Sequence, residues 1–253
     1  NRMLETKNVT IKFGGLTAVN NVTMQVRPGK ITALIGPNGA GKTTLFNCIS
    51  GVYTPNSGEV ILHGQHLEGK MGYKINAAGI ARTYQVINLF WNMTVLENVL
   101  VGMHSRLKAN FWDSLFNTKK KRQEEKAIVE KAHEWLKFVG LDEYANDRAG
   151  SLSYGKQRLL EIVRGLASEP KVILLDEPAA GMNTTEKAEL DSLLQQILSM
   201  GYTILVVEHD MKLIMNISDY FYVLCQGSLL AEGTPEEIQN NPEVIAAYLG
   251  GDE

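Results

Sequence analysis

Three apolar runs of this chain are continuous rather than alternating: residues 30–35, 172–175 and 203–207. Short continuous runs bounded by polar or glycine residues are typical of strands buried on both faces of a parallel sheet. Each run leads into residues that can carry chemistry: a glycine-rich loop, then Asp176 and Glu177, then His209. Ligands of open α/β sheets bind at the carboxyl ends of the strands, so we expect a site at that edge.

Shorter β-like runs, separated by turn signals, occupy both ends of the chain. Those near the beginning are residues 8–13, 22–26 and 58–62. They predict a small antiparallel sheet beside the main one. Near the other end, residues 221–225 and 228–232 flank Gln226–Gly227 and predict a hairpin. Pro235 and Pro242 each predict the start of a short helix.

Helical patterns dominate the middle of the chain, after a predicted strand at residues 81–85 that ends in Gln85 at a potential hinge. Thr94 and Glu97 form a capping-box pattern that predicts a helix start. An amphipathic pattern from about Gln123 to Val139 predicts a second helix, which Gly140 ends. Ser153 is a natural N-cap for a third helix that runs to about residue 168.

Two segments leave alternatives open. The run from Val86 to Met93 is apolar without a clear period, so it either packs into a local core or presents an apolar surface to a partner. Residues 104–123 contain a predicted apolar helix face followed by a basic run. Two interpretations fit this pattern equally well: an exposed helix end with a solvated basic run, or a contact with anionic lipid or a partner. The face consists of Phe111, Trp112, Leu115 and Phe116, and the run is 119–122.

The glycine-rich loop Gly36–Thr44 fits the pattern G-x-x-x-x-G-K-[ST] between a predicted strand and a predicted helix. In that context successive backbone N–H groups and the helix N-terminus can cradle phosphates. Lys42 can then reach the terminal phosphates, and the Thr43 hydroxyl can ligate Mg²⁺. Phe13, upstream in a strand that ends at glycines, either stacks on an adenine or is an ordinary core residue.

Composition narrows the class of protein. With 44% hydrophobic and 21% charged residues, the 253-residue chain is ordinary for a soluble globular protein. With a net charge of −3, the chain lacks the excess of basic residues that is typical of nucleic-acid-binding proteins. Cys48 and Cys225 stand far apart in apolar runs and are expected to be buried free thiols, which suits a reducing cytoplasm. No apolar run reaches the ~18 residues of a membrane span.

Together the motifs resemble the ATP-binding subunit of an ABC transporter across essentially the whole chain. The matching residues, in chain order, are Phe13, Gly36–Thr43, Gln85, Leu152–Gln157, Leu174–Glu177, Ala180–Asn183 and His209. A phosphate loop alone defines a superfamily, whereas the signature motif Leu152–Gln157 between the loop and the acidic strand end is specific to this family. The resemblance implies an α/β fold: a P-loop NTPase (RecA-like) core with an antiparallel β subdomain, formed by residues 1–86 and 169–253. An α-helical subdomain, residues 87–168, is inserted into it.

The resemblance also implies a role for each matching residue. ATP would be bound by Phe13 and the loop of one copy, together with Ser153 and Gly155 of a second copy arranged head to tail. The loop residues are Gly36, Pro37, Asn38, Gly39, Ala40, Gly41, Lys42, Thr43 and Thr44. Thr43, Gln85 and Asp176 would hold Mg²⁺. Glu177 would act as general base on the attacking water, while His209 and Gln85 sense the γ-phosphate.

Three positions depart from the usual family pattern. In the signature motif, Tyr154 replaces a glycine and Lys156 replaces a glutamine, while Gly155 keeps the backbone approach to phosphate. Asn183 stands where the D-loop usually ends in aspartate, which keeps an acceptor but removes the charge.

Within the family, the chain is most similar to the ATP-binding subunits of branched-chain amino-acid importers. The residues that carry this similarity are Phe13–Leu16, Met93–Asn98, Leu152–Gly155, Glu208–Asp210 and Glu232–Pro235, together with the extra segment 104–123 and its Phe-Trp and Leu-Phe pairs. It implies a cytoplasmic protein, peripheral on the inner face of the cell membrane. Its partners would be a second ATP-binding subunit, permease subunits docking near Val86–Met93 and, indirectly, a solute-binding protein.

Two alternatives stand beside this reading. Related cassettes serve urea, amide or lipopolysaccharide transport. A soluble ABC ATPase acting in translation or DNA repair is the alternative from another class, but such proteins usually carry two cassettes or a long coiled-coil insertion, and this chain has neither.

Overall fold

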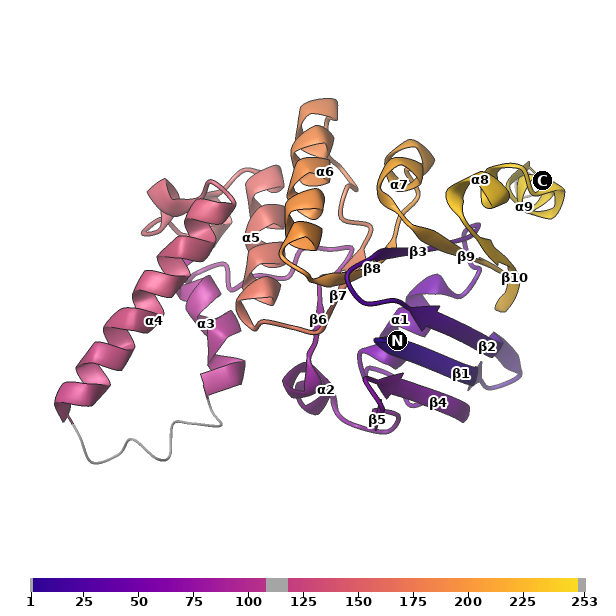
Figure 1. The fold of residues 1–253 in the computed structure, drawn as a ribbon, viewed down its shortest axis with the longest axis horizontal. Helices are drawn as coiled ribbons and strands as arrows, with labels where there is room; N and C mark the ends of the chain where they lie inside the picture. Colours follow the sequence, from indigo (N-terminus) through magenta and orange to yellow (C-terminus); the bar gives the residue numbers. More distant parts are fainter. Residues whose placement is uncertain (1, 108–117, 250–253) are drawn as a thin grey trace.

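The structure, a computed structural model, describes residues 2–107 and 118–249 and contains two sheets (Figure 1). The smaller sheet is antiparallel, in the order β2-β1-β4-β5. Its strands are β1 (Leu4–Phe13), β2 (Leu16–Val26), β4 (Ser57–Leu62) and β5 (Gln65–His66). It confirms the antiparallel sheet predicted from the first part of the sequence.

The larger sheet has the order β10-β9-β3-β8-β7-β6. Its strands are β3 (Ile31–Ile35), β6 (Ile80–Arg82), β7 (Val172–Asp176), β8 (Thr203–Val207), β9 (Tyr220–Cys225) and β10 (Ser228–Gly233). All neighbours are parallel except β9 and β10, which form the predicted hairpin. Because β8 lies between β3 and β7, the three continuous apolar runs are adjacent strands whose carboxyl ends meet at one edge.

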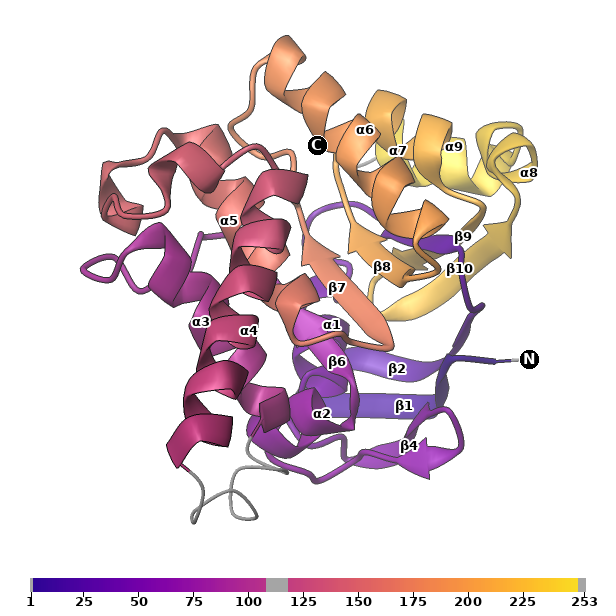
Figure 2. The ribbon, with the colours of Figure 1, turned by 60° about the vertical axis from the view of Figure 1, so that its left-hand side comes forward.

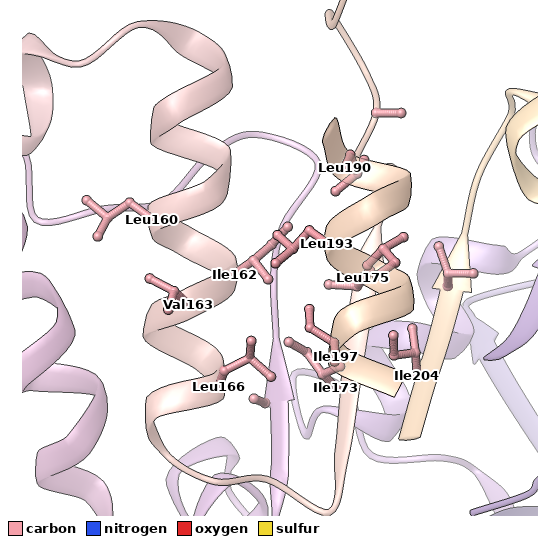
Figure 3. Packing of buried hydrophobic residues seen from close by; sticks show 14 of the residues in the cluster. Leu160, Ile162, Val163, Leu166, Ile173, Leu175, Leu190, Leu193, Ile197 and Ile204 are labelled. Atoms are coloured by element: carbon pink, nitrogen blue, oxygen red, sulfur yellow. The ribbon is translucent and has the colours of Figure 1, made fainter. Parts of the chain in front are cut away.

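Both faces of the larger sheet are covered, which explains why its strands are apolar without alternation. On one face, β7 packs against α5 (Tyr154–Ala167) and α6 (Thr184–Ser199), with Ile173 and Leu175 between them (Figure 3). On the other face, Leu174 belongs to a second core, shared with α1 (Lys42–Ile49) and the smaller sheet.

Helices α3 (Val95–Leu107), α4 (Thr118–Phe138) and α5 lie together on the side of the molecule away from the smaller sheet (Figures 1 and 2). The capping box predicted for α3 is confirmed: the Glu97 N–H donates to Thr94 Oγ1 over 3.1 Å, and the Thr94 N–H donates to Glu97 Oε2 over 2.7 Å. Helix α4 begins five residues before the predicted start at Gln123. The predicted apolar face formed by Phe111, Trp112, Leu115 and Phe116 falls outside the described residues.

Shorter helices complete the fold. They are α2 (Gly72–Ala78), α7 (Met211–Ile217), α8 (Pro235–Gln239) and α9 (Pro242–Leu249), with 3₁₀ turns at Asp142–Tyr144 and Ala149–Ser151. Both C-terminal helices begin at the predicted prolines. Over the described ranges, no helix is long and apolar enough to cross a membrane.

Two sequence-based expectations need correction, and one open alternative is resolved. The strand predicted at residues 81–85 ends at Arg82. The Thr83 N–H still donates to the carbonyl oxygen of Leu174 in β7, but the carbonyl oxygens of Tyr84 and Gln85 accept from Arg158 of α5 instead of from a strand. Cys225 is only half-buried, whereas Cys48 is buried as expected. The run from Val86 to Met93 does both things that were posed as alternatives: Ile87 and Leu89 are buried, while other members are exposed. The exposed members are Val86, Phe90, Trp91 and Met93.

Candidate functional site

The carboxyl ends of β3, β7 and β8 open into one cleft of about 660 Å³. Residues distant in sequence meet there: Phe13 from β1, the glycine-rich loop after β3, Gln85 after β6, Glu177 after β7 and His209 after β8. A volume of this size is typical of a small-molecule site. The structure therefore brings together most of the residues that the sequence nominated.

Two glycines of the loop are required by their surroundings. Gly41, the N-cap of α1, has φ of +99°, and a Cβ there would lie 2.6 Å from the carbonyl oxygen of Ala18. At Gly36 a Cβ would collide with the carbonyl oxygen of Leu224 in the neighbouring strand β9. Because backbone atoms cannot move aside cheaply, only glycine allows the loop to curl so closely against β2 and β9.

Lys42, the first residue of α1, is folded back onto the loop. Its Nζ donates to the carbonyl oxygens of Gly36 and, over 3.1 Å, of Pro37. Burial lowers the pKa of Lys42, and the nearby carboxylates of Glu177 and Asp176 oppose that shift. A buried ammonium held by two carbonyl oxygens is ready to exchange them for phosphate oxygens, which are stronger charged acceptors.

Glu177 lies between two other nominated residues. The Gln85 Nε2 donates to its Oε2 over 2.8 Å, and His209 Nε2 lies 2.6 Å from its Oε1. The Glu177 N–H still donates to the carbonyl oxygen of Val207 in β8 over 2.8 Å. Its φ of +46° is not a strand conformation, so the chain leaves β7 at this residue. Both carboxylate oxygens are thus held facing the cleft.

Asp176, at the end of β7, is 3% exposed. Its Oδ2 lies 3.3 Å from Nη2 of Arg82, and its Oδ1 is buried with no hydrogen-bond partner among the described residues. Burial raises the pKa of Asp176, and the Arg82 guanidinium opposes that shift. Asp176, Thr43 and Gln85 line one cleft, so a carboxylate, a hydroxyl and an amide converge there. This all-oxygen set and the orphan Oδ1 fit Mg²⁺, which keeps several waters and takes few protein ligands.

Phe13 lies at the rim of the cleft and is 45% exposed. Its ring forms a T-shaped pair with Tyr53, with ring centroids 5.1 Å apart. This exposure contradicts the alternative of an ordinary core phenylalanine and is compatible with stacking on a base.

Ser153 and Gly155 lie apart from this cleft and line a second one of about 450 Å³ together with Lys156, Met182 and Glu186. Ser153 is the N-cap of α5, but its hydroxyl makes no capping hydrogen bond. The Ser153 hydroxyl and the first backbone N–H groups of α5 therefore lie in a different cleft from the glycine-rich loop of the same chain.

Comparison with known proteins decides the family. A family model described as "ABC transporter" matches residues 19–180. The chain belongs to the ABC transporter family. A second model, described as "Branched-chain amino acid ATP-binding cassette transporter", matches residues 228–253, which include β10, α8 and α9.

Curated relatives and solved structures match this chain over nearly its full length. The high-affinity branched-chain amino acid transport ATP-binding protein LivG of Escherichia coli K12 is 49% identical over 98% of both chains. The ADP conformation of MJ1267, an ATP-binding cassette of an ABC transporter, superposes with a TM-score of 0.84 at 32% identity, covering 99% of both chains. A dimeric post-hydrolysis structure of the cassette MJ0796, bound to ADP and phosphate, gives 0.76 at 27% identity and covers 92% of this chain and 99% of that one. The fold is that of the ABC ATPase cassettes, as predicted.

Several residues of this ABC cassette site were not identified from the sequence. Arg82 is the buried partner of Asp176, and its Nη1 also donates to Asn47 and Ser50 of the α1 region. Glu208, 4% exposed, accepts from the N–H groups of Ala179 and His209 and so joins the loops after β7 and β8. Burial raises the pKa of Glu208. Arg82 and Glu208 stand beside apolar residues in the sequence, but a charge next to an apolar run does not reveal its partner.

Proposed function

We propose that this chain is the ATP-hydrolysing subunit of an importer of branched-chain amino acids. The observation that carries the proposal is the carboxylate of Glu177, held between Gln85 and His209 in the same cleft as the phosphate loop. That arrangement can orient a water against a terminal phosphate. The relationship to LivG supports the class of solute.

The nucleotide would lie along the cleft, with its base against Phe13 and its phosphates on the loop and the N-terminus of α1. Backbone N–H groups of residues 36–44 bind the phosphates, and Lys42 leaves the carbonyl oxygens it now contacts to reach them. No large rearrangement of the chain is needed, because Lys42 already lies in the loop.

Mg²⁺, held by Thr43, Gln85 and through water by Asp176, would neutralise charge on the phosphate oxygens. The chain itself supplies the proton chemistry. Glu177 takes a proton from the attacking water, and His209 and Gln85 hold the carboxylate oxygens in place. In phosphoryl transfer, positioning of this kind carries most of the rate enhancement.

A second ATP-binding subunit, identical or homologous, would complete each site. Ser153 and Gly155 lie on a separate surface, so they contact phosphate only if they belong to a second copy arranged head to tail. The dimeric relative with bound ADP and phosphate supports such an arrangement.

The permease subunits would dock on the exposed part of the Val86–Met93 run. Phe90 and Trp91 are 45% and 42% exposed and follow Gln85 closely in the chain. Apolar side chains gathered on a surface beside a nucleotide sensor are typical of a protein interface. Docking there would hold the cassette on the inner face of the cell membrane, and a solute-binding protein would act through the permease.

The experiment is reconstitution of the chain with its permease subunits in vesicles, followed by ATP-driven uptake of radiolabelled leucine. Uptake should require the intact chain and should be competed by isoleucine and valine, but not by urea or an amide. Uptake of urea or an amide instead would show that the proposed solute is wrong. The assignment of the chain as a transport ATPase would still stand. Copurification with nucleic acid or ribosomes, without a permease, would favour the soluble alternative.

A further inference from the structure

The carboxylate of Asp176 is held through one of its two oxygens. Its Oδ2 lies 3.3 Å from Nη2 of Arg82, while its Oδ1 is buried and has no hydrogen-bond partner among the described residues. The backbone of Asp176 is fixed separately, because its N–H donates to Thr83 Oγ1 over 3.4 Å. Arg82 is therefore the described contact that decides how this carboxylate can turn.

Arg82, the last residue of β6, has its own orientation fixed by α1. Its Nη1 donates to Asn47 Oδ1 over 2.6 Å and to Ser50 Oγ over 2.7 Å. The Ser50 oxygen is free to accept, because its hydroxyl hydrogen is donated to the carbonyl oxygen of Phe46 over 2.9 Å. Asn47 and Ser50 are three positions apart at the end of α1, so they present both acceptors on one face.

Two aromatic rings lie against the same guanidinium. Its Cζ is 4.6 Å from the centroid of the Tyr84 ring and 5.8 Å from that of Phe46. The Arg82 side chain is only 6% exposed, so these contacts are shielded from water. A planar group bonded on two sides and packed against rings cannot turn without losing several contacts at once. Arg82 thus joins α1, which begins with Lys42 and Thr43, to the end of β7.

The ion pair of Arg82 and Asp176 is poorly built for stability alone. Arg and a carboxylate usually form two parallel bonds, but here one contact of 3.3 Å joins them. The Arg82 Nε and the Asp176 Oδ1 are both buried without a partner among the described residues, and each such atom costs free energy of folding. The arrangement instead leaves Oδ1 unused on a residue that shares a cleft with Thr43 and Gln85.

We propose that Arg82 is a positioning residue of the metal site. It holds Asp176 Oδ2 so that Oδ1 stays available for a water of Mg²⁺, and it ties this carboxylate to the helix whose first turn carries Thr43. Outer groups that orient metal ligands in this way contribute to metal affinity without touching the metal. The inference rests on the proposed function, because only there is Asp176 assigned to Mg²⁺.

The test is the affinity for Mn²⁺, a spectroscopic substitute for Mg²⁺, measured from the free-ion signal in electron paramagnetic resonance. The protein is kept in excess over a non-hydrolysable ATP analogue, so that the analogue is bound. Arg82→Lys is the main variant, because lysine keeps the charge but has a single nitrogen that cannot serve both α1 and Asp176. Ser50→Ala removes one acceptor of Arg82 and is a milder variant in case the first does not fold. Arg27→Lys is the matched control, since Arg27 also lies over a tyrosine ring, that of Tyr220, but lines neither the nucleotide cleft nor the cleft of Asp176.

Arg82→Lys should weaken Mn²⁺ binding by about tenfold, and Ser50→Ala should weaken it by less. The affinity for the analogue in EDTA should stay at the parental value, and Arg27→Lys should behave as the parent. Asp176→Asn measures the contribution of the carboxylate itself and should weaken Mn²⁺ binding at least as much as Arg82→Lys. Because Arg82 acts through Asp176, the double variant should bind Mn²⁺ no more weakly than Asp176→Asn alone.

Parental Mn²⁺ affinity in Arg82→Lys would overturn the inference, because a positive charge at this position would then be sufficient. An equal loss of analogue affinity in EDTA would also overturn it, since that is the result of a purely structural role. Additive losses in the double variant would do the same, because Arg82 would then act independently of Asp176. Parental Mn²⁺ affinity in Asp176→Asn would instead remove Asp176 from the proposed metal site, and the inference with it.

Discussion

Replacing Glu177 by glutamine separates chemistry from binding in this cassette. Glutamine keeps the shape of the side chain but cannot take a proton from water. Loss of a general base typically lowers a rate by about 10²–10⁴-fold, which corresponds to roughly 3–5 kcal/mol of activation free energy. We therefore expect ATP turnover to fall by that factor.

The contacts of Glu177 allow the same substitution to leave folding and ATP binding nearly unchanged. The carboxylate accepts from Gln85 and contacts His209, and a glutamine retains one oxygen for one of them. The Gln85 amide can turn so that its own oxygen accepts from the new NH₂ group. The loss is at most one hydrogen bond, about 0.5–1.5 kcal/mol, which is smaller than the expected effect on the barrier.

Three measurements check this reasoning: phosphate release for turnover, calorimetry for ATP affinity, and light scattering for dimer formation. The variant should bind Mg-ATP with near-parental affinity and accumulate as an ATP-dependent dimer. Glu97→Gln is the matched control, since glutamine also serves in the α3 capping box. Turnover of Glu177→Gln within about threefold of the parent would refute the role of the carboxylate as base.

Two further predictions address binding and coupling. Lys42→Ala should weaken ATP binding itself by about 10–100-fold, because a charged hydrogen bond to phosphate contributes about 1.5–3 kcal/mol, and unchanged affinity by calorimetry would contradict that assignment. Replacing Phe90 and Trp91, which are half-exposed, by aspartate should lower the melting midpoint by only a few degrees while abolishing copurification with the permease. Leu89 of the same run is only 4% exposed, so Leu89→Asp should unfold the region. If the double substitution lowers the melting midpoint as much as Leu89→Asp does, Phe90 and Trp91 belong to the core.

Local pattern was sufficient to determine much of this protein. The continuous apolar runs are strands buried on both faces, and the capping residues Thr94 and Glu97 start a helix as their short-range chemistry dictates. The glycine-rich loop was readable because its conformation depends on residues within a few positions of one another. The ordered set of motifs then identified the family.

Tertiary structure alone decided which side chains meet. The pairing of Arg82 with Asp176, and of Arg158 with the carbonyl oxygens of Tyr84 and Gln85, joins residues 73 or more positions apart. No periodicity encodes such pairs, because a buried charge finds its partner only after strands and helices have packed.

The same limit explains one error in the length of a strand and one alternative that the sequence left open. The strand predicted to reach Gln85 stops at Arg82, and from Tyr84 onward the carbonyl oxygens bond to Arg158 of α5 rather than to a neighbouring strand. The irregular run after Gln85 could not be assigned to core or surface, because burial of Ile87 and Leu89 and exposure of Phe90 and Trp91 depend on how that backbone is held against α5. The sequence specifies which residues are apolar, and the packed neighbours determine which of them face water.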